Sequence, residues 1–257
     1  MPARLSDKRP LIGFLQTRRN PEVSELTGIC GYDFALMDCE HGILSESDCL
    51  ETAALLTAGG VLALVRLADH DPKAVGKFLD MGIDAVVIPN VSTAAQATLL
   101  ARATQYPPFG TRSFGASLHR VTRYGIVSAE TETEPQSNAR LLVMIESALG
   151  VNNVEEIVAV DGVDGIVVGP WDLTASLGQL GDFSQPGYAE ALARVERAAN
   201  SAGKLLGTAP HPGSTAEALV ARGYRLLIVA ADMPLFREAM TSQLLKARSA
   251  IRTQEKT

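Results

Sequence analysis

The sequence predicts an α/β fold, a single (β/α)8 TIM barrel that takes up residues 1–257. Two observations point to it: eight short apolar runs are spread along the chain, and a segment with helical features follows each of them. Strands buried on both faces are almost continuously apolar, and strands that alternate with helices are typical of a parallel sheet. Eight such units in a chain of 257 residues match the closed barrel. A doubly wound sheet would be expected to carry a glycine-rich phosphate turn, but the sequence contains no G-x-G-x-x-G or Walker pattern.

The predicted strands are short runs rich in Val, Ile and Leu: Leu11–Leu15, Phe34–Met37, Val61–Val65, Ala85–Ile88, Leu141–Ile145, Gly165–Val168, Leu205–Thr208 and Leu226–Ala230. Three helix starts carry an N-cap residue, two before a proline and one in a pattern that resembles a capping box: Asn20-Pro21, Asp71-Pro72, and Ser45 with Asp48. Gly59 and Gly82 stand where a glycine after a helix end is expected. The remaining predicted helices are Ser92–Tyr106, Gly150–Val160, Tyr188–Ala202, Thr215–Gly223 and Pro234–Ile251.

Irregular segments interrupt this alternation at two places and end the chain. The fourth unit is followed by an excursion at residues 105–139, and the sixth strand leads into a loop over Trp171–Gly187. Loops longer than about 12–15 residues in a compact domain are usually functional or disordered. Residues 252–257 are predicted to form a frayed tail.

Charge and composition exclude several classes of protein. Asp plus Glu number 29 and Lys plus Arg number 23, which gives a formal net charge of −6. Without clustered basic residues to neutralise phosphates, we expect no nucleic-acid partner. No stretch approaches the roughly 20 apolar residues of a membrane span, and Met1–Pro10 is charged and lacks the apolar run of a signal peptide. A cytoplasmic protein without membrane contact is expected.

The three cysteines do not indicate a disulfide framework or a zinc site. Cys30, Cys39 and Cys49 are odd in number, are separated by nine and ten residues, and form no C-x-x-C pair. We therefore expect them to be small buried hydrophobic residues in a reducing compartment.

Candidate chemistry follows the strands, because the active sites of such barrels lie at the carboxyl ends of the strands. Glu146 and Asp172 follow two neighbouring strands, which lie about 4.8 Å apart. Two carboxylates with open positions between them are how Mg²⁺ is typically held. The alternative is a pair of solvated acids in loops.

A histidine and an arginine follow the second and third strands. His41 could act as a general base oriented by Asp38 and Glu40, or it could be structural. Arg66 suits a keto or enolate oxygen, and a salt bridge to one of these acids is the alternative. No lysine stands where Schiff-base chemistry would need it, so carbon–carbon bond chemistry beside a carbonyl would require a metal as the electron sink.

The sequence resembles the HpcH/HpaI aldolase family from about Leu11 to Met240. The matching segments are Phe34-Ala-Leu-Met-Asp-Cys-Glu-His41, Val65-Arg66, Tyr106-Pro-Pro-Phe-Gly-Thr-Arg112, Ile145-Glu146 and Gly169-Pro-Trp-Asp-Leu-Thr-Ala-Ser-Leu-Gly178. Its motifs D-x-E-H and G-P-x-D-L-S/T are specific in combination. The family comprises metal-dependent class II pyruvate aldolases on phosphoenolpyruvate/pyruvate-type barrels, among them 4-hydroxy-2-oxoheptanedioate and 2-dehydro-3-deoxyglucarate aldolases.

The resemblance implies a retro-aldol cleavage of a 4-hydroxy-2-oxo acid to pyruvate and an aldehyde, or the reverse, as in aromatic or sugar acid catabolism. Glu146 and Asp172 would hold Mg²⁺ or Mn²⁺, with Co²⁺ as a further option and no organic cofactor. The substrate would chelate this cation, and the cation and Arg66 would stabilise the pyruvate enolate. His41, through a water, would take the 4-hydroxyl proton. Backbone N–H groups around Trp171 and Asp172 would receive the substrate carboxylate.

By the same resemblance, Asp80 corresponds to an acid that raises the basicity of the histidine. The end of the third helix should, however, lie at the opposite end of its own barrel. The two statements agree if Asp80 reaches the site of a neighbouring subunit. The family's hexamer, a trimer of dimers that exchange their last helix, makes this arrangement possible.

Two positions depart from the family pattern. Met144 stands where these aldolases commonly have a glutamine that contacts substrate, and methionine cannot donate an amide hydrogen bond. Trp171 stands at a position that is often small, and its bulk would narrow the pocket.

Two other functions remain open. One keeps the enolate and changes the reaction, to oxaloacetate decarboxylation or another pyruvate-enolate lyase step. The other is a non-catalytic barrel module, whose expected mark, loss of the equivalents of Glu146, Asp172 or Arg66, is absent from the sequence.

Overall fold

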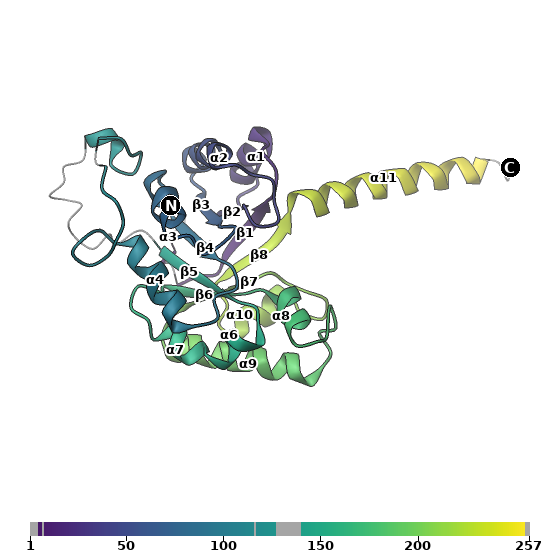
Figure 1. Cartoon of the computed structure of the whole chain (residues 1–257). Helices are drawn as coiled ribbons and strands as arrows, with labels where there is room; N and C mark the ends of the chain where they lie inside the picture. The colour runs from purple at the N-terminus through teal and green to yellow at the C-terminus, as the bar shows by residue number, and fades with distance from the viewer. Residues whose placement is uncertain (1–4, 7, 116, 127–139, 255–257) are drawn as a thin grey trace.

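The protein forms a closed barrel of eight parallel strands in sequence order, which confirms the (β/α)8 prediction (Figure 1). This computed structural model describes residues 5–6, 8–115, 117–126 and 140–254. The strands are β1 (Leu11–Gln16), β2 (Phe34–Asp38), β3 (Leu62–Arg66), β4 (Ala85–Ile88), β5 (Arg140–Ile145), β6 (Gly165–Val168), β7 (Leu205–Thr208) and β8 (Leu226–Ala231). β8 pairs with β1 and closes the barrel, with one register shift between Gly13 and Phe14.

Side chains alternate along each strand between the barrel lumen and the surrounding helices. The lumen is filled by a buried apolar cluster that draws residues from every strand: Leu11, Phe34, Leu36, Leu64, Ala85, Val87, Leu142, Met144, Val167, Leu205 and Leu226. The intervening strand residues pack outward against the helices in a second, larger cluster. The lumen is therefore a packed core, and function is confined to its rim.

Helices follow the strands and cover the barrel. They are α1 (Pro21–Ile29), α2 (Glu46–Ala58), α3 (Pro72–Asp80), α4 (Ala94–Thr104), α6 (Ala148–Asn152), α7 (Val154–Val158), α8 (Pro170–Ser176), α9 (Pro186–Ser201), α10 (Ala216–Ala221) and α11 (Asp232–Gln254), with a 3-10 turn η1 (Arg123–Gly125). The predicted N-caps form: Asn20 accepts from the amide of Val23, and Ser45 makes a full capping box with Asp48. Asp71 accepts from the amide of Lys73.

Three local predictions differ from the structure. The helix predicted over Gly150–Val160 starts earlier, where the Ser147 side chain caps it, and is divided into α6 and α7 at Asn153. The loop predicted over 171–187 contains the short helix α8, which proline at its first position favours. Gly82 adopts the left-handed conformation expected after a helix, with φ +81°, but after α2 Gly60 does so (φ +75°) while Gly59 stays helical.

The end of β8 is tied to the end of β1 through one carboxylate. Asp232 accepts hydrogen bonds from the backbone amides of Thr17 (2.7 Å) and Arg18 (3.0 Å) and from the Thr17 hydroxyl (2.8 Å). These contacts fix the loop that follows β1. The loop lies at the end of the barrel where the strands have their carboxyl ends, and we call this end the mouth of the barrel.

The last helix does not fold back over the barrel. α11 leaves the mouth end of β8 and extends away from the other helices (Figure 1). At 1.5 Å per residue its 23 residues span about 34 Å. Its helical structure includes Arg252, the start of the predicted frayed tail, while residues 255–257 lie outside the described part. Among the described residues, no helix is both long and apolar enough to cross a membrane.

The predicted excursion at 105–139 is described as far as residue 126, apart from residue 116, and the described chain resumes at Arg140, the first residue of β5. Its described part projects beside α3 and α4 (Figure 1). It is anchored by backbone hydrogen bonds from Thr111 to Arg102 (2.8 Å) and from Val121 to Asp80 (3.2 Å).

Candidate active site

Three polar side chains form the top layer of the barrel lumen. Asp38, Arg66 and Glu146 each come two residues after a lumen-facing apolar residue, namely Leu36, Leu64 and Met144. Because alternate strand residues point to the same side, all three face inward at the mouth. Asp38 and Arg66 are also direct register neighbours on β2 and β3.

Asp38 fixes the orientation of Arg66 with two hydrogen bonds. Arg66 Nε donates to Oδ1 (2.9 Å) and Nη2 donates to Oδ2 (2.7 Å), while the amides of Glu40 and His41 donate to Oδ1 as well. Burial alone would raise the pKa of Asp38, but the hydrogen bonds and charge of Arg66, together with the two amides, lower it below its ordinary value. Asp38 is thus a charged group that aligns a charged arginine.

Glu40 adds a second carboxylate to the same arginine. Arg66 Nη1 lies 3.0 Å from Glu40 Oε2 in an ion pair, so the two acids together contact all three nitrogens of the guanidinium. Burial raises the pKa of Glu40, and the charges of Arg66 and His41 oppose that rise. The salt bridge that the sequence offers as the alternative role of Arg66 is therefore present. It holds the remaining N–H groups of the guanidinium in a fixed direction.

His41 lies at the rim of the mouth. Its side chain is 63% exposed, and Nε2 lies 3.9 Å from Glu40 Oε2. Its backbone amide is held by Asp38 (3.2 Å). The histidine is therefore accessible to a ligand, on a turn whose backbone is fixed.

Glu146 is buried, and of its two carboxylate oxygens only one accepts a hydrogen bond from the described residues. Oε1 accepts the backbone amide of Asn90 (2.6 Å), whereas Oε2 is buried and has no hydrogen-bond partner among the described residues. Gly169 lies directly beside it, because a Cβ added there would be 2.1 Å from Oε2. The glycine provides the space that this carboxylate occupies.

The charges around Glu146 favour a cation. Burial, together with the negative charges of Glu40 and Asp172, raises the pKa of Glu146 to about 7, against the opposing effects of the Asn90 amide and Arg66. Asp172 lies in the first turn of α8 and is exposed. The described residues include no group of three or more His, Cys, Asp or Glu side chains that could hold a metal. Two carboxylates with an orphaned oxygen still fit a hard divalent cation that takes its other ligands from water and substrate.

The start of α8 lies beside these acids. Leu173 makes the first helical hydrogen bond, to the Gly169 carbonyl (3.0 Å), so the amides of Trp171 and Asp172 precede it. Amides at such a position are donors for an anion. Trp171 is half exposed, and its ring lies edge-on to Phe183 at 5.0 Å.

Met144 occupies the lumen directly below Glu146. It is buried within the inner cluster and pairs in register with Val167 on β6. At this level the lumen presents a thioether and no amide, as the sequence predicts.

Asp80 lies apart from these residues within one chain. It ends α3, which leads into the start of β4 and therefore reaches the end of the barrel opposite to the mouth. There it accepts hydrogen bonds from Arg112 Nε (3.0 Å) and Nη2 (2.6 Å), and His119 Nδ1 lies 3.3 Å away. The position of Asp80 in its own barrel is the one expected from the order of the elements.

Sequence reasoning missed two contributions to the site. The amide of Asn90 and the close approach of Gly169 both depend on how neighbouring strands are paired. Strand register was the signal that could have found Gly169: Ile145 pairs with Val168, so the next residues, Glu146 and Gly169, are neighbours.

Comparison with known proteins gives consistent matches over nearly the whole chain. Residues 12–239 match the model of the HpcH/HpaI aldolase/citrate lyase family. A 5-keto-4-deoxy-D-glucarate aldolase of Escherichia coli is 34% identical over 237 residues, 92% of each chain. A hydroxypyruvate/pyruvate aldolase of Delftia acidovorans is 33% identical over 253 residues, 98% of this chain and 94% of the other. The crystal structure of a family protein from Burkholderia cenocepacia superimposes with a TM-score of 0.87 at 30% identity, over 95% of this chain and 96% of that one.

Proposed function

Because the chain belongs to the HpcH/HpaI aldolase/citrate lyase family, and is with it a carbon–carbon lyase, we propose that it cleaves a 4-hydroxy-2-oxo acid to pyruvate and an aldehyde, or joins the two. The observation that carries the proposal is that two groups lie at the same barrel mouth: the Glu146 carboxylate, with one oxygen that has no hydrogen-bond partner among the described residues, and the Arg66 guanidinium, which is held in one orientation. One group is suited to a cation and the other to an oxyanion.

Glu146 and Asp172 are the residues that would hold a divalent cation, Mg²⁺, Mn²⁺ or Co²⁺. Bound there, the cation supplies Lewis-acid polarisation of the substrate's 2-oxo group. The orphaned Oε2 atom of Glu146 and the space left by Gly169 support this assignment.

The other residues of the mouth bind and orient the substrate. The amides of Trp171 and Asp172 receive the carboxylate of the 2-oxo acid. Arg66 donates to the 2-oxo oxygen, on which negative charge grows as the C3–C4 bond breaks and its electrons pass into the enolate. Asp38 and Glu40 keep the guanidinium in one orientation, so little reorganisation is needed during the reaction.

His41 transfers the proton of the reaction. In cleavage its imidazole takes the proton of the 4-hydroxyl, directly or through a water, as that oxygen becomes the carbonyl of the leaving aldehyde. The C3 carbon of the enolate then gains a proton to give pyruvate. The exposed side chain of His41 and its neighbour Glu40 support this role.

The wall of the site suggests how the substrate differs from those of related aldolases. Met144 presents an apolar thioether below Glu146, and Trp171 presents an indole beside Asp172. Met144 cannot donate an amide hydrogen bond, and the indole of Trp171 narrows the mouth. We therefore expect preference for an aldehyde portion that is smaller or less hydroxylated than a sugar-acid fragment.

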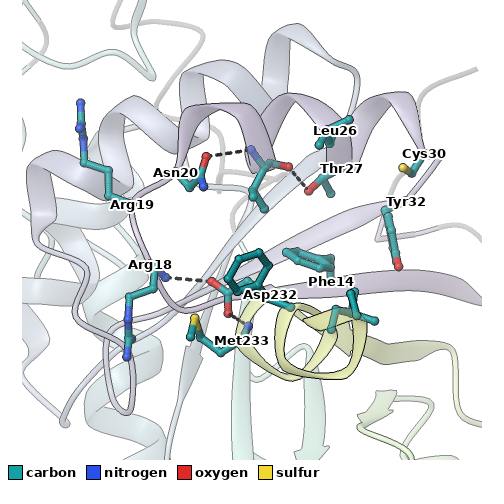
Figure 2. A pocket seen from close by; sticks show the side chains of 14 residues that line it. Phe14, Arg18, Arg19, Asn20, Leu26, Thr27, Cys30, Tyr32, Asp232 and Met233 are labelled. Carbon is teal, nitrogen blue, oxygen red and sulfur yellow. Dashed lines mark hydrogen bonds between the residues drawn. The ribbon is translucent and has the colours of Figure 1, made fainter. Parts of the chain in front are cut away.

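The extended last helix supports a proposed assembly of the chain with itself. α11 and α1 enclose an apolar groove of about 620 Å³, lined among others by Phe14, Leu26, Tyr32 and Phe236 (Figure 2). Beyond the groove the helix exposes Met240, Leu244, Leu245 and Ile251. A second copy of the chain, with the same helix and the same groove, would cover both surfaces by exchanging α11.

Exchange of α11 would give dimers, and three dimers would form the expected hexamer. In that assembly Asp80, held by Arg112 and His119, would act at the mouth of a neighbouring barrel and raise the basicity of its His41. Light scattering on the purified protein tests the assembly. Leu244→Asp should dissociate it, whereas Lys246→Glu on the same exposed helix should leave it intact.

Turnover on a panel of 2-oxo acids tests the reaction. The panel contains 4-hydroxy-2-oxo acids with short, branched, aromatic and polyhydroxylated aldehyde portions, and oxaloacetate. The proposal requires at least one 4-hydroxy-2-oxo acid to be cleaved faster than oxaloacetate is decarboxylated. If oxaloacetate is the fastest substrate throughout, the enzyme is a decarboxylase.

A further inference from the structure

Two cysteines that the proposed reaction does not use lie side by side next to the mouth. Cys39 follows Asp38 at the end of β2, and Cys49 lies in the first turns of α2. Their Sγ atoms are 3.4 Å apart, and both thiols are free. The third cysteine, Cys30, is exposed at the end of α1.

The surroundings of the two sulfurs differ. Cys49 is 0% exposed and packs in the outer core with Ala53 and Leu56. Cys39 is only partly buried at the edge of that core. Hydrogen bonding from Cys49 lowers the pKa of the Cys39 thiol, whereas the same contact and burial raise the pKa of Cys49. Cys39 is therefore the more accessible of the two thiols and the more easily ionised one.

We propose that Cys39 and Cys49 form a reversible disulfide on exposure to a peroxide, and that this bond switches the neighbouring site off. The Cys39 thiolate attacks one peroxide oxygen, the O–O bond breaks, and the hydroxide that leaves becomes water. The Cys49 sulfur then attacks the resulting Cys39 sulfenic acid, and the S–O bond breaks with loss of a second water. In sum, two thiols and one hydrogen peroxide give one disulfide and two waters.

In the proposed switch, closing the bond moves Cys39. The two sulfurs have to approach from 3.4 Å to about 2.05 Å. Cys49 sits on a helix held by a full capping box and by close packing, so the displacement falls on the side of Cys39. The movement strains the hydrogen bond that the Cys39 backbone amide donates to the Arg66 carbonyl (2.9 Å).

The segment around Cys39 has little room to absorb the movement. It runs from Asp38 to Gly42 in a tight turn, where a Cβ added to Gly42 would lie 2.0 Å from the Asp38 carbonyl oxygen. Asp38 and Glu40, on either side of Cys39, are the two acids that orient Arg66. Misplacement of such groups by about 1 Å can lower turnover on the order of 100-fold.

The inference rests on the proposed function only for its activity measurement. Full-length protein is treated with hydrogen peroxide, quenched with catalase, and divided for non-reducing peptide mapping, hydrogen exchange and pyruvate release. We expect one disulfide between Cys39 and Cys49, altered exchange in the Asp38–Gly42 segment, and pyruvate release lower by about 10- to 100-fold. A phosphine reductant should restore all three.

Two variants separate this disulfide from other oxidation. Cys49→Ala removes the resolving thiol from the core, outside the residues that touch substrate, and should retain activity after peroxide under conditions that inactivate the wild type. Cys30→Ser removes the exposed thiol and should lose activity as the wild type does. Equal loss in Cys49→Ala and wild type would overturn the proposal, and so would a mapped Cys39–Cys49 disulfide in a protein with full activity and unchanged exchange.

Failure of the proposed function gives a different pattern. The reduced wild type would then release no pyruvate from any substrate, while the mapped bond and the exchange of the Asp38–Gly42 segment would still report whether the disulfide forms and displaces the turn.

Discussion

Arg66 and Asp38, register neighbours on β2 and β3, meet in a two-point contact, with 2.9 Å between Nε and Oδ1 and 2.7 Å between Nη2 and Oδ2. A planar guanidinium held at two points cannot rotate, and Glu40 holds a third nitrogen at 3.0 Å. The position and direction of one positive charge at the mouth are thereby fixed before any substrate binds.

Replacing this arginine by lysine should impair the reaction more than the fold. A lysine in Arg66→Lys keeps the charge but cannot make the two-point contact or present a planar donor edge. We expect kcat/KM to fall about 100- to 1000-fold, the loss typical for one oxyanion donor. Arg194→Lys is the matched control, because Arg194 makes the same kind of two-point contact with Glu155 on the exposed surface of α9. Equal activity losses in the two variants would contradict the role of Arg66.

The space beside Glu146 can be removed with one methyl group. In Gly169→Ala the new Cβ would lie 2.1 Å from Glu146 Oε2, so the carboxylate must move away from the position that suits a cation. Titration with Mn²⁺ should give an affinity about 10- to 100-fold below that of the wild type. Gly59→Ala serves as the control, since its nearest neighbours lie 3.5 Å from the added Cβ and its φ is −79°. Unchanged Mn²⁺ affinity in Gly169→Ala would show that Glu146 does not bind the ion.

Stability should depend on pH through Glu146, whose pKa rises from 4.5 to about 7 on folding. Between these values the folded protein keeps a proton that the unfolded chain has released, so the free energy of unfolding falls as pH rises through this window. Above pH 7 the destabilisation that comes from ionising the buried Glu146 is complete. Without a cation it lowers the free energy of unfolding by about 3 kcal/mol. Added Mn²⁺ should raise Tm at pH 8 much more than at pH 5, and Glu146→Gln should lose both the pH dependence and the response to Mn²⁺. A variant that still responds to Mn²⁺ as the wild type does would refute the assignment.

His41 should be needed for one of two related reactions. Retro-aldol cleavage requires a base for the 4-hydroxyl proton, whereas decarboxylation of oxaloacetate has no such proton. His41→Ala should therefore lose about 100- to 10,000-fold in aldol cleavage and keep its decarboxylase rate. Parallel loss of both activities would assign His41 to binding or to the fold.

The sequence predicts the barrel for two reasons. Each strand is covered on both faces and is therefore almost continuously apolar, and cap residues and glycines mark the ends of the helices between the strands. Asp38, Arg66 and Glu146 are predictable for a related reason: each directly follows an apolar run of the sequence, where alternation directs it into the mouth. The two short helices on either side of Asn153 are not predictable, because their break depends on the hydrogen bond from the Asn153 side chain to the Ser92 carbonyl on another loop.

The features of the site that the sequence does not predict depend on contacts between different segments of the chain. The spacing of Cys39 and Cys49 gives no indication that the sulfurs touch, because their contact depends on how α2 packs beside the end of β2. The position of Glu40 before His41 suggests that the two side chains are partners, yet the charge nearest to Glu40 is Arg66 on the adjacent strand. Such contacts follow from register and helix packing, which are properties of the closed barrel.

Pyruvate release measured with and without a chelator tests the central claim most directly, the claim that Glu146 and Asp172 hold a divalent cation on which aldol cleavage depends. The wild-type protein should release pyruvate from a 4-hydroxy-2-oxo acid, lose this activity in the chelator, and regain it when Mn²⁺ is returned in excess, while Glu146→Gln should stay inactive throughout. Undiminished pyruvate release in the chelator, or wild-type activity in Glu146→Gln, would contradict it.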